Sequence, residues 1–196
     1  HLLDLINDIL DLARIEAGMV DLRVERFAVG DLLRDVVETG KVLGLEKQVE
    51  VDWIDSGCAD VVMRTDRQKL QQILLNLVNN GVKFSSAGTV RIHSSVLSDE
   101  NVEITVTDTG IGIPPDELEF IFDEFRQVDG SSTRQYGGSG LGLTISRKLA
   151  RLLGGAVSVV SEVGVGSTFS VLVAREAPTS LTLGEPPSPY SGDIGS

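Results

Sequence analysis

The sequence predicts a two-layer sandwich of the α/β or α+β class. Strand-like segments with period-two alternation and helix-like segments with apolar residues at helical spacing are interspersed between residues 18 and 175. Several of the strand-like segments follow one another directly, so neighbouring strands are expected to form one sheet. The chain has 196 residues, 41% of them hydrophobic and 23% charged, which fits one compact domain with some additional sequence.

The chain begins within a helical pattern. The apolar residues of residues 2–13 form a broad stripe, the polar residues occupy the remaining face, and Gly18 is expected to end the helix. A lone helix cannot bury such a stripe, so we expect it to pack on a segment that precedes His1 and on a second copy of the chain. Because the sequence starts in mid-pattern and without Met, we expect it to be a piece of a longer protein.

After Gly18, segments with the period-two alternation of strands are interspersed with segments that have the apolar spacing of helices. Asp66 is a natural N-cap for a helix that carries apolar residues at i, i+3, i+4, i+7 and i+8 from Leu70 to Val78. A short helix is predicted from Pro115 to Phe122, since Pro is tolerated in the first turn of a helix. Strands are predicted over residues 20–27, 49–55, 60–66, 89–97, 102–110, 156–162 and 166–174, and helices over residues 29–47, 67–84, 115–122 and 141–153, with a loop at 126–138.

Three parts of the chain follow from these patterns. Residues 1–17 hold the N-terminal helix, residues 18–175 the sandwich, and residues 176–196 a stretch rich in Pro, Ser and Gly that lacks any periodicity. We expect this last stretch to be a linker or a disordered tail.

Composition excludes several classes of partner. With 29 acidic against 17 basic residues, a net charge of −12 and no basic run, the chain is not expected to bind nucleic acid or an anionic membrane surface. No apolar run reaches the length of about 18 residues that a membrane span needs. Cys58 stands alone, so an internal disulfide is impossible and a cytoplasmic location is expected, although a longer protein could be anchored in a membrane upstream.

The glycine-rich stretch YGGSGLG at residues 136–142 fits neither of two common nucleotide motifs. A dinucleotide-binding fingerprint would directly follow a strand, whereas a polar loop precedes these glycines. A P-loop needs Gly-Lys-Ser or Gly-Lys-Thr, and the only Gly-Lys pair, at residues 40–41, lies in a predicted helix before Val42. What remains is a glycine hinge at a helix N-terminus, which favours an anion such as phosphate.

Two further groups of residues suggest a ligand site. Asn76, Asn80, Lys83 and Phe84 share one face of the predicted helix, and their side chains suit a hard cation, a phosphate and a base; alternatively, the polar ones are solvated and Phe84 belongs to the core. At Asp108, a strand ends in a carboxylate before two glycines, Gly110 and Gly112, that allow a ligand to approach. The alternative is a capping Asp in a tight turn.

Taken together and in order, these stretches resemble the ATP-binding domain of sensor histidine kinases over roughly residues 18–175. Gly81 departs from the family pattern, in which Ala is usual. The stretches that carry the resemblance are the N box NLVNNGVKF at residues 76–84, the first glycine box DTGIG at 108–112, the F box FIFDEF at 120–125, the second glycine box GGSGLGL at 137–143 and the last glycine segment GVGSTF at 164–169.

The resemblance implies the Bergerat ATP-binding fold, in which about three helices cover one face of a mixed, mostly antiparallel sheet. It also implies that residues 1–17 are the second helix of the dimerisation and phosphoacceptor hairpin, which forms a dimeric four-helix bundle. The resemblance implies that the first helix of the hairpin, which carries the phosphoacceptor, is missing from this chain. His1 lacks the sequence context of the family's acceptor, and His93 lies in a predicted strand. We therefore expect that the fragment does not phosphorylate itself.

The resemblance also implies roles for individual residues. Asp108 would accept a hydrogen bond from the adenine amine with Thr168 nearby, Asn80 would bind Mg²⁺, and the glycines of the second glycine box would form the hinge of a lid over residues 126–140. Catalytic roles fall to Asn76, Asn80, Lys83 and Arg134. Contacts with ATP fall to Asn80, Lys83, Phe84, Asp108, Gly110, Gly112, Phe122, Arg134, Gly138, Gly140, Leu141, Gly142 and Thr168.

The implied activity is transfer of the γ-phosphoryl group of ATP to a histidine, with an aspartate on the receiver domain of a response regulator as final acceptor. One alternative is an ATPase of the gyrase and MutL kind, but those proteins place a catalytic Glu where this chain has Asn76, which cannot act as a base. The other is a dimerising adaptor that binds nucleotide without catalysis, against which intact Asn80, Asp108 and Gly110 argue.

Overall fold

The computed structural model describes residues 2–125 and 140–178 of the chain. Its helices are α1 (Leu2–Glu16), α2 (Val29–Leu45), α3 (Arg67–Phe84) and α4 (Gly142–Leu152). Its strands are β1 (Glu25–Ala28), β2 (Val49–Asp55), β3 (Val62–Thr65), β4 (Gly88–Val96), β5 (Asn101–Asp108), β6 (Ala156–Glu162) and β7 (Gly166–Ala174).

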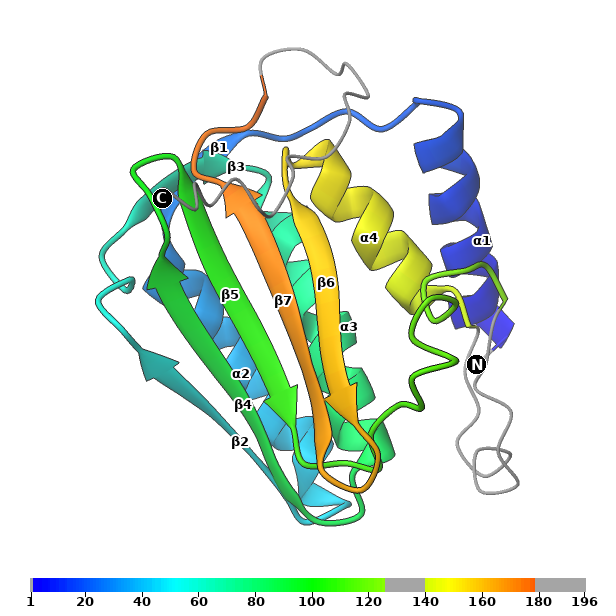
Figure 1. Cartoon of the computed structure of the whole chain (residues 1–196). Coiled ribbons are helices and arrows are strands. Elements are labelled where there is room, and N and C mark those ends of the chain that lie inside the picture. The colour runs from blue at the N-terminus through cyan, green and yellow to red at the C-terminus, as the bar shows by residue number, and fades with distance from the viewer. Residues whose placement is uncertain (1, 126–139, 179–196) are drawn as a thin grey trace, which may run out of the picture.

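The main sheet has five strands in the order β2-β4-β5-β7-β6, and a separate pair is formed by β1 and β3. Within the main sheet β2 and β4 run parallel, whereas the other neighbours are antiparallel. Helices α2, α3 and α4 pack on one face of this sheet, and in the described part of the chain no helix covers the other face (Figure 1). The predicted fold class, a mixed and mostly antiparallel sheet with helices on one face, is confirmed.

Period-two alternation decides which side chains of the sheet meet the helices. On β5, Val102, Ile104 and Val106 are buried, while the residues between them are half-buried or exposed. The antiparallel neighbour β7 continues the same layer with Phe169 and Val171. The layer ends at the carboxyl end of β5, where the next buried position is a carboxylate instead of an apolar side chain.

The buried carboxylate of Asp66 begins α3 and anchors the segment before β1. Its Oδ1 accepts a 3.0 Å hydrogen bond from the Lys69 N–H, so Asp66 is the predicted N-cap. Its Oδ2 accepts a 2.8 Å hydrogen bond from the Arg23 N–H. The strand predicted over residues 20–27 is wrong in its first half, because the Arg23 backbone bonds to this side chain, and β1 starts only at Glu25.

The helix predicted over residues 115–122 is also wrong, since this stretch forms consecutive turns. The Glu117 N–H bonds to the Pro114 carbonyl at 3.0 Å and the Phe120 N–H to the Glu117 carbonyl at 2.9 Å, each across three residues. Bonds across three residues are those of turns and of 3₁₀ geometry, so this stretch does not form the regular hydrogen-bond ladder of an α-helix.

The backbone after β7 pairs with β3. The Arg64 N–H donates to the Arg175 carbonyl at 2.7 Å, and the Ala177 N–H donates to the Arg64 carbonyl at 2.8 Å. On its other edge β3 pairs with β1, where Arg64 lies opposite Arg26. The segments that lead into and out of the sandwich therefore flank a single strand.

Helix α1 packs beside α4 through part of its apolar stripe (Figure 1). Leu12 is buried, and the Lys148 ammonium on α4 bonds to the carboxylates of Glu16, at the end of α1, and Glu124. Leu5 is half-buried, whereas four other apolar residues of the stripe are exposed, with relative exposures between 42% and 75% for Leu3, Ile6, Ile9 and Leu10.

Candidate functional site

Asp108 is a buried carboxylate at the end of β5, with 7% of its surface exposed. Its Oδ1 accepts a 2.8 Å hydrogen bond from the Gly110 N–H, and the Ser167 backbone N–H also donates to the carboxylate. Burial raises the pKa of Asp108, although these two hydrogen bonds act in the opposite direction. A carboxylate held in this way keeps capacity to accept a further hydrogen bond from a ligand.

The strand register places Ser167, and not Thr168, beside Asp108. Asp108 lies opposite Ser167, whereas Thr107 lies opposite Thr168 on the other face of the sheet. The hydroxyls of Thr107 and Thr168 are 3.0 Å apart there, so Thr168 bonds away from the carboxylate. Ser167 was not among the residues predicted from the sequence, although period two counted back from the apolar Phe169 puts residue 167 on the buried face.

Ser167 belongs to a small network of hydroxyls at this corner. Its Oγ is 2.9 Å from the Oγ of Ser161 on β6, which donates to the Gly166 carbonyl at 2.9 Å. The Ser161 Oγ in turn accepts a 2.8 Å hydrogen bond from the Ile113 N–H. The segment after Asp108 is thereby fixed to the ends of β6 and β7.

The first glycine box depends on glycine where it crosses the end of β6. Gly112 has φ of +71°, and a Cβ there would overlap the Glu162 carbonyl. At Gly110 a Cβ would lie 2.7 Å from the Phe84 carbonyl, which also accepts a 3.3 Å hydrogen bond from the Ile111 N–H. The loop therefore joins the end of β5 to the last residue of α3.

The structure places Asn80, Lys83 and Phe84 together on the last turns of α3, each half-buried. The Lys83 ammonium lies 4.8 Å from the centre of the Phe84 ring. Burial and the neighbouring Lys47 ammonium lower the pKa of Lys83. Lys47 donates a 2.5 Å hydrogen bond to the Lys83 carbonyl, and it thereby satisfies one of the free carbonyls at the end of α3.

Asn76, one turn before Asn80, faces α4. Its Nδ2 donates a 2.8 Å hydrogen bond to the Oγ of Ser146, which is 1% exposed. Its Oδ1 lies against Gly142, where any Cβ would overlap it. The structure therefore brings Asn76 to the start of α4, together with Gly142 and the buried Leu141.

The F box packs on α4 through Phe122, which is 7% exposed. Its carbonyl accepts hydrogen bonds from the Thr144 hydroxyl at 2.8 Å and from the Arg147 guanidinium at 3.2 Å. The same guanidinium lies 5.1 Å from the centre of the Phe122 ring. These contacts fix the F box to α4, and neither Thr144 nor Arg147 was predicted from the sequence.

Two of the expected site residues, Arg134 and Gly138, lie outside the described residues. Gly140 is described and has φ of +69°, a left-handed conformation that glycine adopts freely. Within the described ranges no group of three or more His, Cys, Asp or Glu is placed to hold a metal ion. None of the helices described there combines the length and the hydropathy of a membrane span.

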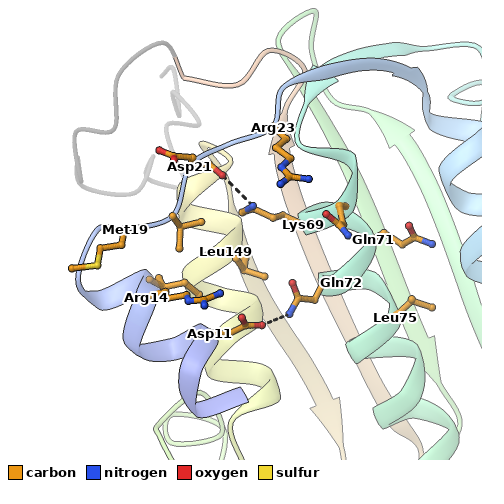
Figure 2. Close-up of a pocket in the computed structure, with 13 residues that line it drawn as sticks. Asp11, Arg14, Met19, Asp21, Arg23, Lys69, Gln71, Gln72, Leu75 and Leu149 are labelled. Atoms are coloured by element: carbon orange, nitrogen blue, oxygen red, sulfur yellow. Dashed lines mark hydrogen bonds between the residues drawn. The ribbon is translucent and has the colours of Figure 1, made fainter. Parts of the chain in front are cut away.

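A cavity of about 740 Å³ lies elsewhere, between the end of α1, the segment that follows it and the first turns of α3 (Figure 2). Asp11 accepts a 3.2 Å hydrogen bond from Gln72 across it, and the Asp21 carbonyl accepts one of 3.3 Å from Lys69. The lining mixes acidic and basic groups and contains none of the residues singled out from the sequence.

The chain matches known proteins over most of its length. The model of the family "Histidine kinase-, DNA gyrase B-, and HSP90-like ATPase" matches residues 65–177. The chain is 43% identical over 192 residues to the circadian input-output histidine kinase CikA of Synechococcus elongatus, covering 96% of this chain and 24% of that protein. It is 37% identical over 186 residues to the hybrid signal transduction histidine kinase B of Dictyostelium discoideum, covering 93% of this chain and 9% of that protein.

A solved structure with the same architecture is that of full-length ShkA in complex with AMPPNP. It superimposes with a TM-score of 0.81 at 37% identity and covers 91% of this chain and 37% of that one. This chain thus spans about a quarter or less of the two curated relatives above. The chain belongs to the family of histidine kinase-, DNA gyrase B- and HSP90-like ATPases, and within it is the ATP-binding catalytic domain of a sensor histidine kinase.

Proposed function

We propose that this domain binds ATP with Mg²⁺ and presents the γ-phosphoryl group to a histidine of a two-component signalling protein. The observation that carries the proposal is the buried Asp108 carboxylate, held by the Gly110 N–H and paired with Ser167 at the ends of two adjacent strands. Such a carboxylate can accept a hydrogen bond from the exocyclic amine of adenine. Ser167 supplies a hydroxyl beside it.

The phosphate end of the nucleotide is assigned to α3 and to the start of α4. The Asn80 carbonyl oxygen is a suitable ligand for Mg²⁺, which takes few protein ligands and completes its shell with phosphate oxygens and water. Lys83 neutralises phosphate charge, and the N-terminus of α4 offers backbone N–H groups to an anion. Bound Mg²⁺ would supply charge neutralisation as the phosphoryl group leaves ADP.

Further assignments follow the family resemblance. Gly112 allows the backbone to approach the nucleotide, Phe84 and Phe122 flank the site, and Arg134 and Gly138 belong to a lid. Helix α1 would form a homodimer with a second copy through its exposed apolar stripe. We propose the receiver domain of a response regulator as the downstream partner and the cytoplasm as the location.

The hydrolytic alternative is less well supported. An ATPase needs a base to activate water, and the residue one turn before Asn80 is Asn76, whose amide donates to Ser146. A carboxamide has no basic function at neutral pH.

Calorimetric titration with ATP, with and without Mg²⁺, combined with an assay for released phosphate, tests the proposal. We expect binding that is tighter with Mg²⁺ and no steady release of phosphate over many turnovers. Absence of ATP binding would refute the function as a whole, and multiple-turnover hydrolysis would favour the ATPase alternative.

A further inference from the structure

Ser146 lies in the middle of α4 and turns its hydroxyl toward α3. It is 1% exposed, and its Oγ accepts the 2.8 Å hydrogen bond from the Asn76 amide. The two residues are 70 positions apart in the sequence, so this bond joins two helices between which the chain forms β4 and β5. A buried hydroxyl that lost this partner would carry a desolvation cost, which favours keeping the pair intact.

The other end of the Asn76 carboxamide is also fixed. Its Oδ1 lies against Gly142, the first residue of α4, and leaves no room for a Cβ there. This orientation points the carbonyl oxygen at the positive end of the α4 dipole and the amide toward a hydroxyl that can accept. The carboxamide is therefore a spacer of defined length and orientation between α3 and the start of α4.

Asn80 follows Asn76 by one turn and shares its face of α3. Whatever fixes Asn76 against Gly142 also fixes the separation between Asn80 and the N-terminus of α4. We propose that Ser146 is a positioning residue of the nucleotide site: by holding the Asn76 carboxamide, it sets how closely the start of α4 stands to the residue that would bind the metal. This inference rests on the proposed function.

The adenine side of the site lies on the sheet and does not depend on this bond. Asp108 and Ser167 are held by strand pairing and by Gly110. Loss of the Ser146 hydroxyl should therefore weaken binding most for ligands that place phosphate groups and a metal ion between Asn80 and the start of α4. ATP with Mg²⁺ should lose more affinity than ADP without Mg²⁺.

The test is Ser146→Ala, titrated calorimetrically with ATP·Mg²⁺ and with metal-free ADP. We expect ATP·Mg²⁺ affinity to fall by about fivefold to tenfold, the effect of losing one hydrogen bond, and ADP affinity to change by less than about twofold. Ser94→Ala is the matched control, since Ser94 is also fully buried and accepts a 3.0 Å hydrogen bond from the half-buried Trp53 indole, but lies on β4 away from the site. It should lower the melting temperature comparably without changing either affinity.

A double-mutant cycle adds a second readout. If Ser146 acts through Asn76, the variant that combines Asn76→Ala with Ser146→Ala should bind ATP·Mg²⁺ no more weakly than Asn76→Ala alone. Additive losses, an unchanged affinity in Ser146→Ala, or equal losses for both nucleotides would overturn the positioning role. If the unaltered chain binds no ATP at all, the proposed function fails first, so the two failures are distinguishable.

Discussion

The buried carboxylate of Asp108 is the residue whose substitution should most directly affect the binding of ATP. Asp108→Asn keeps an oxygen that can accept from the Gly110 N–H but presents an amide donor in place of the second carboxylate oxygen. We expect ATP affinity to fall by about tenfold or more, the usual effect of removing a charge-assisted hydrogen bond. Calorimetric titration measures the loss. Unchanged affinity with an intact fold would mean that Asp108 does not contact adenine.

The same substitution has an expected effect on stability. Because burial raises the pKa of Asp108, the folded chain holds this proton more tightly than the unfolded chain, and stability falls as the pH rises through the unfolded and then the folded pKa. Asp108→Asn removes this loss. Its melting temperature relative to the unaltered protein should therefore increase from about pH 4 to pH 7, measured without nucleotide. A difference that does not vary with pH would show that the carboxyl has no raised pKa.

The stability of helix α3 depends on the buried carboxylate of Asp66, which caps its first turn. Burial alone would raise the pKa of Asp66, but the N–H groups of Lys69 and Arg23 and the Lys69 ammonium outweigh it and the pKa is lowered. The stabilisation is present above the unfolded pKa and is lost as the pH falls through the lowered folded pKa. Asp66→Ala should lower the free energy of unfolding by about 1–2 kcal/mol or more at neutral pH. Chemical denaturation measures this value.

Asp31→Ala is the control for this loss. Asp31 forms an exposed ion pair with Arg34 on α2, so its removal should cost less than about 1 kcal/mol. Equal losses in the two variants would contradict a special role for the buried cap.

Some secondary-structure elements could be predicted from the sequence and others could not. Helix α3 was predictable because its cap and its apolar spacing agree, and β5 because its alternation is regular. The turns after Pro114 and the irregular segment before Glu25 were not, since their local patterns suit a helix and a strand. In the second case a carboxylate 43 residues away takes the Arg23 N–H, and such a tertiary contact leaves no local signal.

The candidate site shows a similar limit. Motif spacing singled out Asn80, Lys83 and Asp108, and the structure brings α3 and β5, which carry them, into contact. The choice between Ser167 and Thr168 depends on strand register, and the contact between Asn76 and Ser146 depends on how α3 and α4 pack. Neither the strand register nor the packing of the two helices can be read from the short motifs in which these residues lie.

At the scale of the whole molecule, the sheet separates His93 from Asp108. His93 lies on β4 with its ring on the face without helices, where its Nε2 is 2.7 Å from the Ser56 hydroxyl, while Asp108 is on the helix-covered face. We expect the chain to remain unlabelled after incubation with γ-labelled ATP and Mg²⁺, because the sheet separates this imidazole from the proposed nucleotide site. Acid-labile label recovered on His93 or His1 would contradict this expectation. A sensor histidine kinase that contains its phosphoacceptor histidine is the positive control.

Strand β3 has a mechanical consequence for any longer protein that contains this domain. The backbone enters the sandwich along β1 on one edge of β3 and leaves it along residues 175–177 on the other edge. A pull between the segments before Glu25 and after Ala177 would therefore load a few hydrogen bonds at one corner, while the five-stranded sheet and its nucleotide residues would bear little of it. Force carried between these two segments would therefore bypass the residues around Asp108 for as long as the bonds of β3 hold.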